Sequence, residues 1–103
     1  MLTTEQGTHY EHLKQLYVNG FFDSKFDPYI LHLLASEVDT GNDPDEIAIP
    51  ILVRVKYNSQ VDLTDIAQVY GRLETIIFLS ATPLQLMSIL GLPDVEKLEV
   101  SRS

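Results

Sequence analysis

The chain has 103 residues, of which 45 % are hydrophobic, and this fits one globular domain with a modest core. It has no cysteine, which excludes disulfides and thiolate metal sites, and its formal charge of −8 repels phosphate backbones, so we expect no nucleic-acid partner. It has no secretory signal and no apolar run near the ~20 residues that span a bilayer, so we expect a soluble, cytoplasmic protein without a membrane partner.

Two helices are predicted in residues 1–38, which we interpret as a helical N-terminal arm. Thr8 and Glu11 have the spacing of a capping box at the start of the first helix. The second helix should begin at Asp27-Pro28, because Asp is a good N-cap and proline at the first helical position gives up only a donor that has no partner. Its buried stripe is expected to consist of Phe26, Ile30, Leu33, Leu34 and Val38.

Aromatic residues cluster at the turn between these two helices, namely Tyr17, Phe21, Phe22, Phe26 and Tyr29. We favour a small local core that joins the helices. A docking patch is the alternative, because aromatic residues dominate the energetics of interfaces.

Residues 39–46 form an acidic segment, which we interpret as a solvated linker. No Lys or Arg occurs between Lys25 and Arg54. A calcium loop of the EF-hand type is not indicated, because a loop starting at Asp39 would have Pro44 at the sixth position, where the turn requires glycine.

Residues 47–103 are expected to form an α+β unit. Apolar residues alternate from Ile47 to Tyr57, which predicts a strand with one face on a core. A helix is predicted from Asp62 to Gly71, with Asp62 as its cap and a buried face made of Leu63, Ile66, Ala67 and Tyr70. Residues 73–81 are then expected to form a strand that is apolar on both faces, so it is either central or meets a partner with its second face.

The last predicted elements are a helix and a strand. Thr82-Pro83-Leu84-Gln85 forms a capping box with proline at the first helical position, and Gly91-Leu92-Pro93 can end this helix. Residues 95–100 are expected to form the closing strand.

No motif for catalysis or cofactor binding is found. His9 and His12 lie three residues apart, but zinc-binding helices use a spacing of four together with further ligands, so we expect solvated or capping histidines. There is no nucleophile elbow and no phosphate-binding glycine loop. We therefore expect a non-enzymatic protein that uses no metal and no cofactor.

The second half of the chain resembles the propeptide-like domain of subtilisin-type serine proteases. The resemblance rests on three segments: Ile49-Pro50-Ile51-Leu52-Val53-Arg54-Val55, Thr82-Pro83-Leu84-Gln85-Leu86, and Leu92-Pro93-Asp94-Val95-Glu96-Lys97-Leu98-Glu99. It covers about residues 47–103. The family pattern has a hairpin between its two helices, whereas here only Tyr70 to Ala81 is left for both middle strands and no strong turn dipeptide divides it. If this segment is one strand, parallel neighbours are expected.

The resemblance implies a fold and a function. The fold would be a ferredoxin-like sandwich of a three- to four-stranded sheet with two helices, preceded here by the two-helix arm. The function would be that of an inhibitor or folding assistant of a subtilisin-type protease. The sheet would pack on the protease, and the C-terminal tail would lie in the substrate cleft as an added strand. The tail residues are Glu99, Val100, Ser101, Arg102 and Ser103.

The exposed side of the predicted central strand is a second candidate surface. Ile76 and Phe78 would be the partner-binding residues there. The alternative function is a general protein-interaction or oligomerisation module, with another protein or a second copy of the chain as the partner, so that a homodimer is an expected alternative.

Overall fold

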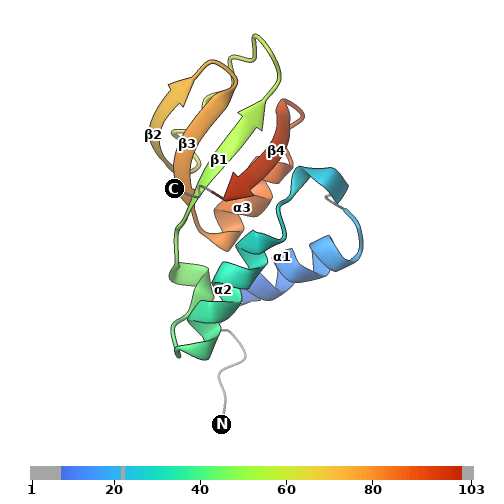
Figure 1. The fold of residues 1–103 in the computed structure, drawn as a ribbon, viewed down its shortest axis with the longest axis vertical. Coiled ribbons are helices and arrows are strands. Elements are labelled where there is room, and N and C mark those ends of the chain that lie inside the picture. The colour runs from blue at the N-terminus through green and yellow to red at the C-terminus, as the bar shows by residue number, and fades with distance from the viewer. Residues whose placement is uncertain (1–7, 22, 101–103) are drawn as a thin grey trace.

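The computed structural model describes residues 8–21 and 23–100, which form helices and one β-sheet (Figure 1). In chain order the elements are α1 (Thr8–Val18), η1 (Asp23–Lys25), α2 (Tyr29–Asp39), η2 (Pro44–Glu46), β1 (Ile49–Val55), β2 (Gln68–Leu73), β3 (Ile76–Ala81), α3 (Pro83–Leu90) and β4 (Val95–Val100), where η marks a 3-10 helix. Both N-terminal helices begin close to the predicted positions.

The strands form one antiparallel sheet in the order β2-β3-β1-β4. The expected α+β class is therefore confirmed, the sheet has four of the expected three to four strands, and the arrangement is compatible with a ferredoxin-like one. The order of the helices differs from the expected sandwich. Within residues 47–100 only α3 is an α-helix, because a loop joins β1 to β2 where a helix was predicted.

The predicted helix from Asp62 to Gly71 is wrong. The Asp62 carboxylate accepts hydrogen bonds from the N–H and the hydroxyl of Thr64, and one turn then closes on the carbonyl of Leu63. The chain enters β2 at Gln68, so the second half of the expected helix is a strand. Pairing with β3 satisfies the backbone of this segment, and tertiary structure thereby overrides the local helical pattern.

A hairpin divides the segment that ends at Ala81, for which the sequence left both one strand and two strands open. Leu73 pairs with Ile76, which leaves Glu74 and Thr75 as a two-residue turn. Glu74 has a φ of 56°, in the left-handed region that glycine usually occupies in such turns. Since every strand neighbour is antiparallel, the parallel pairing expected for an undivided strand does not occur.

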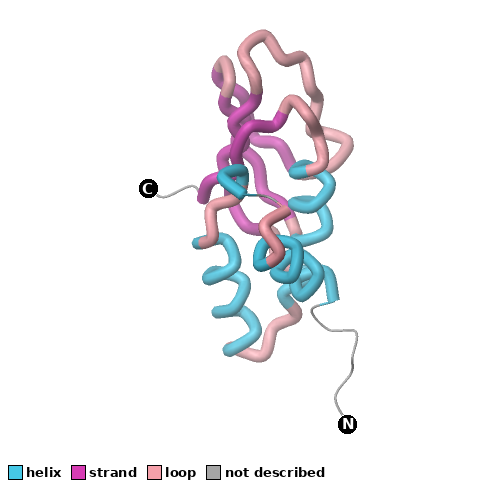
Figure 2. The backbone as a smooth tube through the Cα atoms, turned by 90° about the vertical axis from the view of Figure 1, so that its right-hand side faces the viewer, coloured by secondary structure: helices cyan, strands magenta, loops and turns pink. Residues whose placement is uncertain are grey.

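One face of the sheet carries the hydrophobic core. The burial of β1 alternates as predicted, and the buried side chains of this strand are Ile49, Ile51, Val53 and Val55. The N-terminal helical segment adds to the same cluster the side chains of Tyr10, Leu13, Phe26, Ile30 and Leu34. Figure 2 shows the helices beside and below the sheet, and the arm is thus packed against the rest of the chain.

The acidic segment before β1 is more ordered than the solvated linker that was expected. Pro44 is buried, and the Asp45 carboxylate accepts hydrogen bonds from the backbone N–H groups of His9 (3.0 Å) and Tyr10 (2.9 Å). These are donors of the first turn of α1, which have no partner within the helix. Asp45 therefore caps α1 from a distant position in the sequence.

Candidate interaction surface

The face of the sheet opposite the core is not covered by any helix among residues 8–21 and 23–100 (Figure 2). We call this surface the open face. Cross-strand register places its apolar residues together, and these are Leu52, Tyr70, Leu73, Ile76 and Phe78. Exposed apolar residues that adjoin one another in this way are typical of surfaces that bind other proteins.

Phe78 lies near the middle of the open face. It is opposite Leu52 of β1 on one side and Gly71 of β2 on the other. Because Gly71 has no side chain, this cross-strand neighbour does not cover the aromatic ring. The Phe78 side chain is 38 % exposed although it belongs to an interior strand of the sheet. A large aromatic ring at the centre of a surface is the usual anchor of a protein interface.

Tyr70 reaches the open face through a β-bulge. The register between β2 and β3 shifts between Val69 and Gly71, and Tyr70 is the extra residue. Its hydroxyl lies 3.0 Å from the hydroxyl of Ser80, which is otherwise buried. The Tyr70 side chain remains 67 % exposed, so its ring is available for contact.

Charged residues surround this apolar centre on the β1 and β4 side. Arg54 and Glu99 form an ion pair of 3.3 Å, and Lys97 is the cross-strand neighbour of Arg54. Both members of the pair are partly solvated, so the pair contributes little to stability, of order 0–1 kcal/mol. An apolar centre with a polar rim is the usual composition of a protein interface.

The two edges of the sheet differ in how they are protected. Phe26 forms an isolated parallel bridge with Leu98, so part of the outer edge of β4 is covered. β2 is the other edge strand, and its bulge twists it away from regular pairing. Addition of a long strand at β2 is thereby disfavoured, and the open face is the better candidate for contact with a partner.

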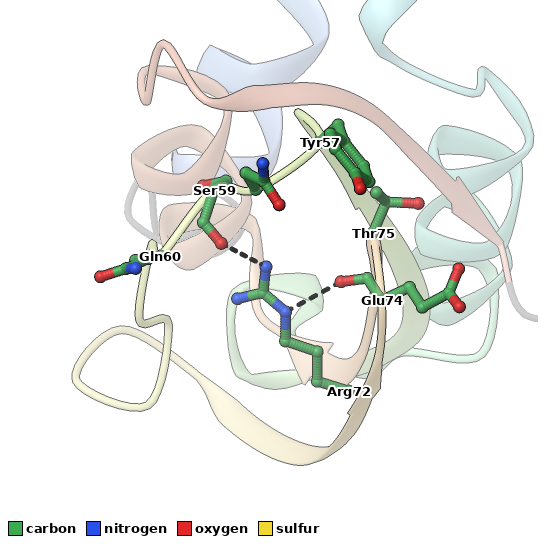
Figure 3. A pocket seen from close by; sticks show the side chains of 7 residues that line it. Tyr57, Ser59, Gln60, Arg72, Glu74 and Thr75 are labelled. Carbon is green, nitrogen blue, oxygen red and sulfur yellow. Dashed lines mark hydrogen bonds between the residues drawn. The ribbon is translucent and has the colours of Figure 1, made fainter.

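A hollow lies between β2 and the loop that follows β1 (Figure 3). Its lining residues include Tyr57, Ser59, Gln60, Arg72, Glu74 and Thr75. The Arg72 guanidinium donates to the backbone carbonyls of Glu74 (3.1 Å), Val61 (3.1 Å) and Ser59 (2.6 Å). Two hydrogen bonds of this side chain thus hold the loop and a third holds the turn between β2 and β3, and we interpret the hollow as a structural feature.

The structure places the predicted binding residues in different environments. Ile76 and Phe78 both lie on the open face and Glu99 belongs to its charged rim, while Val100 is paired with Ile51 of β1. The side chain of Val100 is buried, with 9 % exposed. Ser101, Arg102 and Ser103 lie outside the described residues. A free tail that enters a cleft could therefore begin only after Val100.

Sequence reasoning missed three residues of the open face. Tyr70 was assigned to the inner face of a helix, and Leu73 to the start of an undivided strand. Leu52 did give a signal, because it is an apolar residue on the side of β1 that otherwise carries Arg54 and Lys56. A leucine out of phase with the core pattern indicates that the second face is apolar as well.

The aromatic cluster of the N-terminal arm is only partly a local core. The rings of Tyr17 and Phe26 pack with centroids 5.8 Å apart, and Phe26 belongs to the main core. Tyr29 stacks on His32, and Phe21 is largely exposed. Phe22 lies outside the described residues.

Comparisons with known proteins give no relative: no family model matches the chain, and no curated protein or solved structure matches it significantly. Within the described residues, no three histidine or acidic side chains are grouped so that they could hold a metal ion. None of the helices described is long and apolar enough to cross a membrane.

Proposed function

We propose that the chain is a non-enzymatic protein-interaction domain that inhibits, or assists the folding of, a subtilisin-type serine protease. The observation that carries this proposal is the open face, which presents a partly exposed Phe78 amid apolar neighbours and a charged rim. A surface of this kind is stabilised when a partner removes its apolar area from water.

Two further features support a protease as the partner. One is the resemblance of residues 47–103 to the propeptide-like domain. The other is the position of β4, which ends the described part of the chain at one edge of the sheet and carries Lys97 and Glu99 beside the open face. In the proposed complex the open face contacts the surface of the protease, and the segment after Val100 lies in the substrate cleft as an added strand.

The test is inhibition of a subtilisin-type protease by three purified chains. They are the full chain, a chain that ends at Val100, and a control chain that lacks residues 1–3. A cut at Val100 spares the buried residues of β4, so loss of inhibition would not simply reflect loss of the fold. We expect the inhibition constant to rise about tenfold or more only when residues 101–103 are removed, because the tail then loses its backbone hydrogen bonds to the cleft.

Equal inhibition by all three chains would contradict the role of the tail. Digestion of the full chain without inhibition would contradict the protease as the partner.

A second candidate function is oligomerisation through the open face, and the exposed Tyr70 and Leu73 beside Phe78 favour it. In that case the apolar area would be covered by a second copy of the chain. Sedimentation velocity over a range of concentrations separates the two functions. A dimer that is lost in Phe78→Thr would support oligomerisation, and a monomer at all concentrations would exclude it.

A further inference from the structure

Asp27 connects the start of α2 to the end of β4, although the two segments are more than seventy residues apart in the chain. Phe26 forms the parallel bridge with Leu98, and the backbone N–H of Asp27 donates to the Leu98 carbonyl at 3.1 Å. Figure 1 shows the segment before α2 passing beside β4. The N-terminal arm thus forms a short extension of the sheet at its β4 edge.

The carboxylate of Asp27 continues this pairing after the backbone has turned away. In a regular parallel ladder, the next acceptor would be the Asp27 carbonyl. That carbonyl already accepts from the N–H of Ile30 at 3.1 Å, in the turn that begins α2. The side chain takes its place: Oδ2 accepts from the N–H of Val100 at 3.4 Å, while Oδ1 accepts from the N–H of Tyr29 at 3.0 Å.

The Asp27 side chain therefore binds both the start of α2 and the end of β4. It caps the first turn of α2, and it holds the N–H of Val100 on the side of β4 that faces away from β1. Val100 is also the residue after which the tail of the proposed function would begin. The position and direction of the chain at this point depend on how Val100 is held.

We propose that Asp27 is a positioning residue that holds Val100 at the end of β4, so that the N-terminal arm fixes the point from which the tail of the proposed function would begin. This role rests on the proposed function as far as the protease is concerned. The contact between Asp27 and Val100 itself does not depend on that function.

The informative variant is Asp27→Ser in the full chain. A serine hydroxyl can still cap the helix by accepting from Tyr29, but its side chain is shorter by one atom and holds a single oxygen, so Val100 loses its acceptor. Asp62→Ser is the matched control, because Asp62 accepts from the residue two positions on in the same way but lies in the loop before β2. Asp27→Asn is a second variant in case serine impairs folding. Its amide offers one oxygen, and its NH₂ group cannot accept from an N–H.

The first readout is hydrogen exchange of the Val100 amide, measured by NMR. We expect Asp27→Ser to accelerate it about tenfold, which corresponds to the loss of one hydrogen bond to a charged group. Exchange of the Val53 amide in β1 should not change, and Asp62→Ser should change neither amide. Unaltered exchange at Val100 in both Asp27 variants would overturn the proposal.

The second readout is inhibition of the subtilisin-type protease by the same chains. Inhibition that weakens about tenfold in Asp27→Ser, but not in Asp62→Ser, would support the positioning role. Faster exchange at Val100 with unchanged inhibition would overturn it, because the contact would then be purely structural. If the unmodified chain does not inhibit at all, the proposed function fails, and the exchange experiment alone decides whether Asp27 holds Val100.

Discussion

The guanidinium Nη2 of Arg72 lies 2.6 Å from the backbone carbonyl oxygen of Ser59, so a side chain of the edge strand β2 holds the loop that follows β1 (Figure 3). The same guanidinium donates to the carbonyls of Val61 and Glu74. Arg72 therefore fixes both the loop that stands where a helix was expected and the tight turn between β2 and β3. The planar arrangement of its five donors suits this task.

Replacement of Arg72 should destabilise the protein. We expect Arg72→Lys to lower the free energy of unfolding by about 1–2 kcal/mol, because lysine cannot reach three carbonyls in different directions and the site is open to solvent. Chemical denaturation measures this change. The control is Arg54→Lys, which alters an exposed ion pair and should cost less than about 0.5 kcal/mol. Equal effects of the two replacements would contradict the role assigned to Arg72.

The N-terminal arm and the sheet should unfold together, because Leu13 of α1 is fully buried in the same core as the strands. We expect Leu13→Ala to lower the free energy of unfolding of the whole chain by about 2–5 kcal/mol. Thermal unfolding followed by far-ultraviolet circular dichroism and by NMR signals of β1 should give one coincident transition. An early transition confined to the helices would show that the arm is an independent unit.

Asp62 provides a test of the turn that replaces the predicted helix. Hydrogen bonds from the Thr64 hydroxyl and then from the Thr64 backbone hold the pKa of Asp62 below its ordinary value of 3.8. Since the pKa is lower in the folded state, this contact stabilises the fold at pH values above the ordinary pKa. Its contribution is lost as the pH falls through the folded-state pKa.

Thr64→Ala should therefore raise the pKa of Asp62 toward its ordinary value, because the side-chain hydrogen bond is the largest cause of the shift. An NMR titration of the Asp62 carboxyl carbon measures this. Thr40→Ala, in a turn after α2, is the matched control and should leave the titration as it is. If the pKa of Asp62 is the same in Thr64→Ala, the lowering of this pKa does not arise from the Thr64 hydroxyl.

The sequence predicted most elements whose signals are local. The alternation of β1 and the boundaries of α3 follow from side-chain periodicity and from capping residues such as Thr82, whose backbone N–H donates to the Gln85 side chain as the capping box predicts. For the segment of the predicted helix, burial was predicted only in part, because Tyr70, which was also expected on the buried face, is 67 % exposed. Leu63 and Ala67 are buried as expected of the helix, although that helix does not form.

The errors arise where distant residues decide the conformation. No glycine or asparagine in the sequence indicates the turn at Glu74. Glu74 itself has the left-handed conformation, and a hydrogen bond from Arg72 to its carbonyl helps to stabilise it. The cap on α1 comes from Asp45, and the acceptor for Val100 comes from Asp27, both across long stretches of sequence. The residues of the open face are brought together by the order of the strands, and only Ile76 and Phe78, which lie in an unbroken apolar run, were proposed in advance.

The central claim is that the open face binds a subtilisin-type protease, and the most direct measurement is the dissociation constant with a catalytically inactive protease of this type. Phe78→Thr removes the exposed ring while it keeps a residue that favours strands, and Tyr57→Thr removes an exposed aromatic ring outside the open face. We predict that Phe78→Thr weakens binding roughly tenfold or more, as expected for loss of an interface anchor, and that Tyr57→Thr does not. Equal affinity of the unmodified chain and Phe78→Thr, or no binding by the unmodified chain, would contradict the claim.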